Sequence, residues 1–189
     1  MGTVMNGYTN KKRSLHIVIA TLTFILGVLV YVLDRNPQQI YFLTGFLNHP
    51  LTDGSVFGAI GSSLPSFTHV YAFILFTAAL LPPGRKAYLG ATLAWLATDS
   101  AFEIAQHPAI APIAASAVPD WFAGIPVLEN TRNYLLHSTF DYSDLAAIAM
   151  GAIAAAVTIL ITTRQKGTTT DPTTNVDSGE VTLFTSTNQ

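Results

Sequence analysis

The sequence predicts an all-α membrane protein: a polytopic four-helix bundle with both termini on the cytoplasmic side. Half of the 189 residues are hydrophobic and only 11% are charged, whereas a soluble domain usually carries about 25% charged residues. The mean hydropathy of +0.41 points the same way. Four apolar runs also approach the roughly 20 residues that a helix needs to cross a bilayer.

The four runs lie at residues 15–33, 67–81, 87–106 and 145–163. Frequent β-branched residues do not argue against helix, because only helices and closed barrels satisfy the backbone in lipid. The first run follows three basic residues, as the core of a signal peptide does, but it is longer than such a core and no A-x-A-like cleavage site follows. We therefore expect a retained membrane helix.

The basic residues predict the orientation of the helices. With the N-terminus inside, two basic residues lie outside, Arg35 and Arg132. The other seven then lie inside: Lys11, Lys12, Arg13, Arg85, Lys86, Arg164 and Lys166. This excess of inner basic residues follows the positive-inside rule. It predicts that both termini face the cytoplasm.

The segments between the runs complete the expected organisation. Residues 82–86, PPGRK, form a tight inner turn, while the two outer segments at 34–66 and 107–144 are long and aromatic. We expect interfacial segments in both, including a helix capped by Asn36 and opened by Pro37. The expected domains are a cytoplasmic segment at 1–13, the membrane domain at 14–165 and a disordered threonine-rich tail at 166–189.

Composition also limits the function classes. The chain has no cysteine, so it can form neither a disulfide nor a thiolate metal site. The formal net charge of −2 gives no indication of nucleic-acid binding. We expect no nucleic-acid partner and assign no cofactor.

Polar residues interrupt the apolar runs at one level, near the outer face. Asp99, Glu103 and Gln106 share one stripe of the third helix, at a spacing of 100° per residue. Adjacent helices place further groups at the same end, so that the predicted functional cluster comprises His69, Asp99, Glu103, Gln106, His107, Asp141 and Asp144. His49 and His137 approach it from the outer segments.

A carboxylate within a membrane costs several kcal/mol unless it is paired or hydrated. We expect a protonated His69 to hydrogen-bond Glu103, or else Glu103 to be neutral because burial and Asp99 disfavour its charge. Several residues also have simpler interpretations. Asp141 and Asp144 suit helix caps, His107 and Pro108 suit a helix end, and Gln106 suits the membrane interface.

These residues carry a resemblance to the VanZ-like family of small integral membrane proteins. The family's histidine-plus-aromatic motif corresponds to THVYAF, with His69 and Phe73, and its E-x-x-Q pair to Glu103 and Gln106. The stretch that opens its last helix resembles STFDYSDLAAIAMG, with Asp141, Asp144 and Gly151 in register. Two positions differ, since Ser138 stands where the family has arginine and Ile148 where it has asparagine. The resemblance implies a multi-pass protein of the bacterial inner membrane with a link to the cell envelope.

Three functions remain open from the sequence. The first is binding of a membrane lipid headgroup, an envelope precursor or a protein partner, for which a cationic or hydroxyl-rich group suits the acidic cluster better than a bare phosphate. The second is a structural subunit of a membrane complex, since Ala147, Gly151 and Ala155 form a stripe of small residues that permits close helix packing. The third is a metal-dependent membrane hydrolase, with histidine and carboxylate ligands. No catalytic residue can be assigned.

Overall fold

The computed structural model describes residues 2–34, 54–125, 128–137 and 139–164. Over these residues the protein is helical, and the all-α prediction is confirmed. The elements follow in the order α1 (Gly2–Asp34), η2 (Gly58–Ser62), α2 (Leu64–Leu80), α3 (Arg85–Ala105), α4 (Ala111–Ser116), η3 (Asp120–Phe122), α5 (Thr131–His137) and α6 (Tyr142–Arg164). The predicted interfacial helix after Asn36, His49 and the tail from residue 166 lie outside the described residues.

The four predicted runs correspond to α1, α2, α3 and α6. Proline sets both ends of α2: Pro65 occupies the first turn, where its missing N–H breaks no helical hydrogen bond, and Pro82 follows two residues after the last helical residue. At the N-terminal end, α1 begins at Gly2 rather than near residue 14. The segment expected before the membrane domain is therefore continuous with the first helix.

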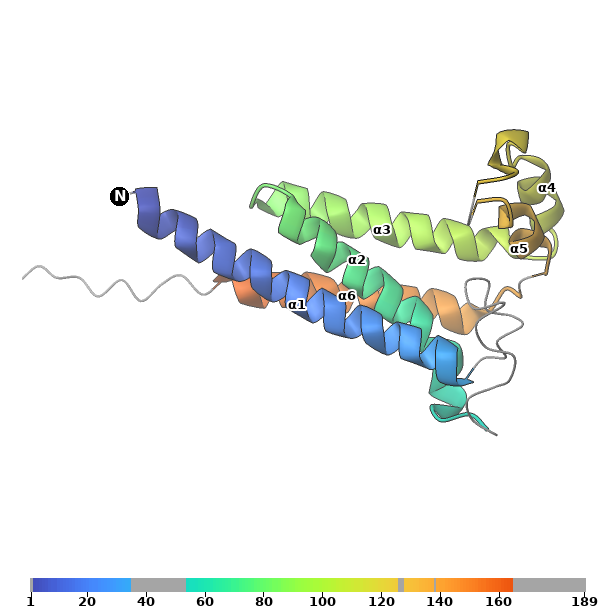
Figure 1. Cartoon of the computed structure of the whole chain (residues 1–189), viewed down its shortest axis with the longest axis horizontal. Helices are drawn as coiled ribbons and strands as arrows, with labels where there is room; N and C mark the ends of the chain where they lie inside the picture. Colours follow the sequence, from blue (N-terminus) through green and yellow to red (C-terminus); the bar gives the residue numbers. More distant parts are fainter. Residues whose placement is uncertain (1, 35–53, 126–127, 138, 165–189) are drawn as a thin grey trace, which may run out of the picture.

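The helices run between two ends of the molecule, shown in Figure 1. The start of α1, the α2–α3 turn and the last turn of α6 lie at one end, which we call the inner end; α4, α5 and η2 lie at the opposite, outer end. Two basic side chains tie the inner end together. Lys12 donates a hydrogen bond to the Thr163 carbonyl at 3.2 Å, and Arg13 donates one to the Leu81 carbonyl at 3.4 Å.

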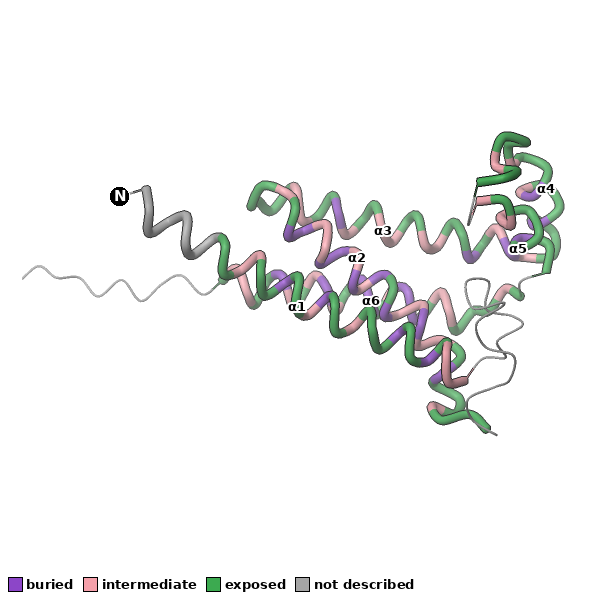
Figure 2. Tube along the Cα trace, viewed as in Figure 1, coloured by how far each residue is buried: buried purple, intermediate pink, exposed green. Residues whose placement is uncertain are grey.

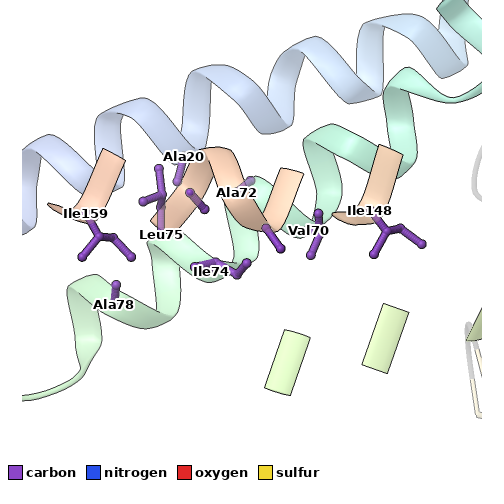
Figure 3. Close-up of a cluster of buried hydrophobic side chains, with 10 residues drawn as sticks. Ala20, Val70, Ala72, Ile74, Leu75, Ala78, Ile148 and Ile159 are labelled. Carbon is purple, nitrogen blue, oxygen red and sulfur yellow. The ribbon is translucent and has the colours of Figure 1, made fainter. Parts of the chain in front are cut away.

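The core forms around α2, which packs against α1 on one side and α6 on the other (Figure 3). α6 also contacts α3. The buried apolar cluster comprises Ala20, Val70, Ala72, Ile74, Leu75, Ala78, Ile148, Ala152, Ala155 and Ile159. Alanine is frequent in this cluster, which lets the helix backbones approach closely.

The small-residue stripe of α6 faces α2, which confirms its interpretation as a packing surface. Ala147, Gly151 and Ala155 are all buried. A Cβ atom on Gly151 would lie 2.5 Å from Val70 Cγ1 and 2.6 Å from the Phe67 carbonyl oxygen. Because one of these neighbours is backbone, it cannot move aside as a side chain could. Only glycine permits this approach of the two helices.

Hydrogen bonds from α1 and α2 to threonines of α6 reinforce the packing. His16, which is 2% exposed, lies 2.8 Å through Nε2 from Thr162 Oγ1. The Thr162 hydroxyl donates to the Thr158 carbonyl at 2.8 Å, so His16 is the donor in the first contact. The Tyr71 hydroxyl lies 2.9 Å from Thr158 Oγ1. Such bonds between apolar helices are worth about 1 kcal/mol each.

Many helical residues are exposed (Figure 2), and a large share of them carry apolar side chains. Two helical segments are long and apolar enough to cross a membrane, Asn10–Asp34 and Tyr142–Arg164, and most of their residues are not buried. α2 is also apolar but has 17 residues. The exposed large apolar side chains include Leu15, Val18, Leu22, Leu29, Leu93, Phe102, Met150, Ile153, Leu160 and Ile161.

The close contact at Gly151 can be tested with a matched pair of glycine-to-alanine variants. In a helix, alanine is favoured over glycine by about 1 kcal/mol, so Gly90→Ala in α3, where a Cβ meets nothing within 4 Å, raises the unfolding temperature slightly. Gly151→Ala instead lowers it, since overpacking costs about 1–3 kcal/mol. Thermal unfolding followed by circular dichroism in detergent measures both. Equal shifts in the two variants would contradict the packing described here.

Candidate functional site

The predicted cluster residues all lie toward the outer ends of α2, α3 and α6, and apart from His107 they separate into two groups. Glu103, Gln106, Asp141 and Asp144 form a rim group where α3 meets the start of α6. His69 and Asp99 form a pair between α2 and α3. Asp99 precedes Glu103 by four residues, so the pair lies about 6 Å further inward along α3.

Glu103 is the centre of the rim group. Its side chain is buried, with 6% of the residue exposed, and its Oε1 accepts a hydrogen bond from the Asp141 backbone N–H at 2.8 Å. Gln106, also buried, donates from Nε2 to the Phe102 carbonyl at 3.2 Å and contacts Glu103 Oε2 at 3.4 Å. The bond to Asp141 joins the outer end of α3 to the residue before α6.

The two aspartates of the rim group have different roles. Asp141 caps α6: its Oδ1 accepts from the Ser143 N–H at 2.8 Å, and hydrogen bonds from the Ser143 backbone and hydroxyl hold the pKa of the Asp141 carboxyl below its usual value. The capping interpretation is thus confirmed for Asp141. Asp144 does not cap in this way, because its buried Oδ1 has no hydrogen-bond partner among the described residues. Both carboxylates repel the charge on Glu103.

The expected bond between His69 and Glu103 is wrong: His69 pairs with Asp99. His69 Nδ1 lies 3.0 Å from Asp99 Oδ2, and the side chains are 47% and 10% exposed respectively. Aromatic rings surround the imidazole, with the Phe73 centroid at 4.4 Å and the Trp95 centroid at 6.2 Å. Trp95 is itself fixed by a 2.8 Å hydrogen bond from Nε1 to Thr77 Oγ1.

This geometry defines what the imidazole offers to a ligand. In a neutral imidazole, a carboxylate that accepts from Nδ1–H fixes the tautomer and leaves Nε2 as an acceptor. The carboxylate is nearly covered and the imidazole is half exposed. With a neutral imidazole, the pair presents a hydrogen-bond acceptor with a negative charge directly behind it.

Two of the predicted histidines have local roles instead. His107 follows the last turn of α3, and its Nδ1 accepts from the Ala109 N–H at 3.2 Å while its ring packs edge-on against Phe140 at 5.2 Å. That contact supports its interpretation as part of the helix end. In α5, His137 contacts the Asn133 carbonyl through Nδ1 at 3.0 Å, which is a bond within its own helix.

The outer end carries little positive charge over the described residues. Arg132 donates to the carbonyls of Ala115 and Val118 and pairs with Asp120 at 3.1 Å, which holds α5 against α4 and η3. No histidine, aspartate and glutamate side chains form a group of three placed to hold a metal ion in the described parts of the chain. The described polar residues of this end offer hydrogen bonds and charge attraction to donor groups.

The bond from Asp141 to Glu103 can be tested through stability. Glu103→Ala leaves the Asp141 N–H without its acceptor and should lower the unfolding free energy by about 1–3 kcal/mol. Glu103→Gln keeps an acceptor oxygen and removes the repulsion from two aspartates, so its stability should equal or exceed that of the unmodified chain. Asp120→Asn, which removes an exposed ion pair, is the control and should change stability by less than about 1 kcal/mol.

Thermal unfolding in detergent distinguishes these variants. A Glu103→Gln loss as large as that of Glu103→Ala would mean that the charge, and not the acceptor oxygen, stabilises this end of the bundle.

The chain was also compared with known proteins. No family model matches it, and neither a curated protein nor a solved structure shows significant similarity to it.

Proposed function

We propose that this chain is a VanZ-like integral membrane protein of the bacterial inner membrane, with α1, α2, α3 and α6 as its spans. We further propose that its outer polar residues bind a lipid headgroup or a lipid-linked envelope precursor. The observation that carries the proposal is the His69–Asp99 pair, half exposed on an otherwise apolar helix surface. A polar pair in that position needs either water or a polar ligand.

The distribution of apolar side chains supports membrane insertion. In a soluble bundle, the longest apolar helices form the core, whereas here α1 and α6 keep most of their residues outside it. A signal peptide would not contribute to the folded protein, yet Ala20 and Val30 of α1 are fully buried. Gly27 of α1 also approaches Thr68 of α2. Contact of these exposed apolar side chains with lipid is favourable, whereas their contact with water is not.

The charge distribution supports the proposed topology. The basic side chains Lys11, Lys12, Arg13, Arg85, Lys86 and Arg164 all belong to the inner end, while Arg132 belongs to the outer end. Under the positive-inside rule the inner end is cytoplasmic. The polar cluster then lies on the opposite side, toward the cell envelope.

The second candidate function is a structural subunit of a membrane complex, and two observations favour it. Glu103 and Gln106 are satisfied within the protein, as expected of residues that fix packing. Exposed apolar residues of the outer segment, Ile113 and Trp121, offer a contact for a protein partner. A metal-dependent hydrolase is not supported, since the described residues bring no three ligands together.

The absence of cysteine allows a clean test of topology. Single cysteines at Gly84 in the inner turn, Ala123 after η3 and Ile153 on the exposed face of α6 cover the two ends and the middle. A membrane-impermeant maleimide applied to intact spheroplasts should label Ala123→Cys. It should label Gly84→Cys only after permeabilisation, and Ile153→Cys in neither case. Simultaneous labelling of Gly84→Cys and Ala123→Cys in intact cells would contradict the topology.

A second experiment separates the binding and structural functions. Asp144→Asn changes a carboxylate whose buried Oδ1 has no hydrogen-bond partner among the described residues, so it should leave membrane accumulation unchanged and alter sensitivity to envelope-directed antibiotics. Glu103→Gln serves as the matched change at a carboxylate with a structural bond. Quantitative immunoblotting of membranes and growth inhibition measure the two properties. Reduced accumulation with Asp144→Asn would favour the structural function.

A further inference from the structure

We propose that the His69–Asp99 pair, with Phe73 and Trp95, is a subsite for a primary ammonium group of a phospholipid headgroup. The inference rests on the proposed function, because it names the chemistry of the headgroup bound at the outer end. It differs from that proposal in committing to a cation that donates hydrogen bonds. The occupant is a membrane lipid of the phosphatidylethanolamine type.

The hydrogen-bonding capacity of the pair selects a donor. Nδ1 of His69 is committed to Asp99 Oδ2 at 3.0 Å, so in a neutral imidazole Nε2 is left as an acceptor. Trp95 Nε1, the other polar atom of this aromatic group, is already bonded to Thr77. With a neutral imidazole, a phosphate oxygen has no donor to meet here. An ammonium or hydroxyl group can donate a hydrogen bond to Nε2.

Charge favours the ammonium over the hydroxyl. Asp99 adds a carboxylate behind the imidazole, and Glu103 lies one turn further out on the same helix. Over the described residues, Arg132 is the basic side chain of the outer end, and its guanidinium is engaged by two carbonyls and Asp120. A cation therefore enters a region of negative charge, where an anionic headgroup would be repelled.

The aromatic rings add a second attraction for a cation. The Phe73 centroid lies 4.4 Å from that of His69 and 4.7 Å from that of Trp95, so the rings adjoin the exposed imidazole. A cation within about 6 Å of such a ring is attracted by its quadrupole. Quaternary choline gains this attraction but cannot donate a hydrogen bond to Nε2. The comparison of the two headgroups thus isolates the role of the pair.

Placement of the pair favours a lipid as the source of the ammonium. Asp99 lies six residues before the end of α3, about 9 Å inward from its outer end. Apart from Thr98, the neighbouring exposed side chains of α3 are apolar, including Leu93 and Phe102. On the other side, Phe24 of α1 contacts Phe73 at 5.9 Å. A headgroup attached to acyl chains can reach this level from the side while its chains cover the apolar surface.

The chain provides its own reporter. It has two tryptophans, and Trp121→Phe leaves Trp95 as the sole indole beside the pair. In phosphatidylcholine nanodiscs with rising fractions of phosphatidylethanolamine, Trp95 fluorescence should change saturably, with no such change for phosphatidylglycerol. Asp99→Asn should raise the half-maximal fraction about tenfold, because it removes the negative charge behind the imidazole that attracts the ammonium. The exposed control Asp120→Asn should leave it unchanged.

A measurement on the unmodified chain makes the result independent of variant folding. Diethyl pyrocarbonate acylates a free imidazole nitrogen and releases ethanol and carbon dioxide. Peptide mass spectrometry should show that phosphatidylethanolamine protects His69 from this reaction relative to the exposed His137 of the same sample, and that phosphatidylglycerol does not. Equal modification of His69 relative to His137 in the two lipids would overturn the inference.

The outcomes separate this inference from the proposed function. Equal saturable responses to phosphatidylethanolamine and phosphatidylglycerol would overturn the ammonium subsite and leave headgroup binding standing. Absence of both a fluorescence response and protection of His69 for every lipid would overturn both.

Discussion

The outer half of this protein depends on one constraint: a carboxylate inside an apolar bundle must find a hydrogen-bond donor. Glu103 finds it in the backbone N–H of Asp141, at 2.8 Å. A backbone donor is fixed in position, so the bond holds the outer end of α3 to the start of α6. Asp99, one turn inward on α3, is then placed beside α2, where His69 is its partner. The position of the pair thus follows from the position of Glu103.

The helices were predictable because each depends on a local pattern. An apolar run bounded by basic residues or prolines predicts a span, and α2, α3 and α6 begin and end within about three residues of their predicted bounds. The spacing of the small residues in α6 likewise predicted which face of that helix packs against a neighbour. The outer segment was harder, because α4, η3 and α5 are short and are held by Arg132 to backbone carbonyls. Composition does not encode such contacts.

The residues of the candidate site were predictable, but their pairing was not. Depth along a helix follows from residue number, which is why His69, Asp99, Glu103 and Asp144 were all placed near one end. Pairing depends on how neighbouring helices are rotated, and the sequence of one helix does not contain that angle. His16 shows the same limit: a single histidine in an apolar run gave no sign that Thr162, at the far end of the chain, was its partner.

The division into two polar groups is itself informative about function. Within the rim group, Glu103 and Gln106 are buried and bonded internally. These hydrogen bonds offset the cost of burying the two polar side chains, which leaves them little capacity to bind a ligand. The His69–Asp99 pair has the opposite character, since half of the imidazole surface remains open. A residue retained only for packing gains nothing from such exposure at an apolar surface, where every unsatisfied polar atom costs free energy. For the proposed headgroup ligand, the cost is recovered when Nε2 meets a donor, and this favours a contact on the α2–α3 side of the bundle in addition to any at Asp144.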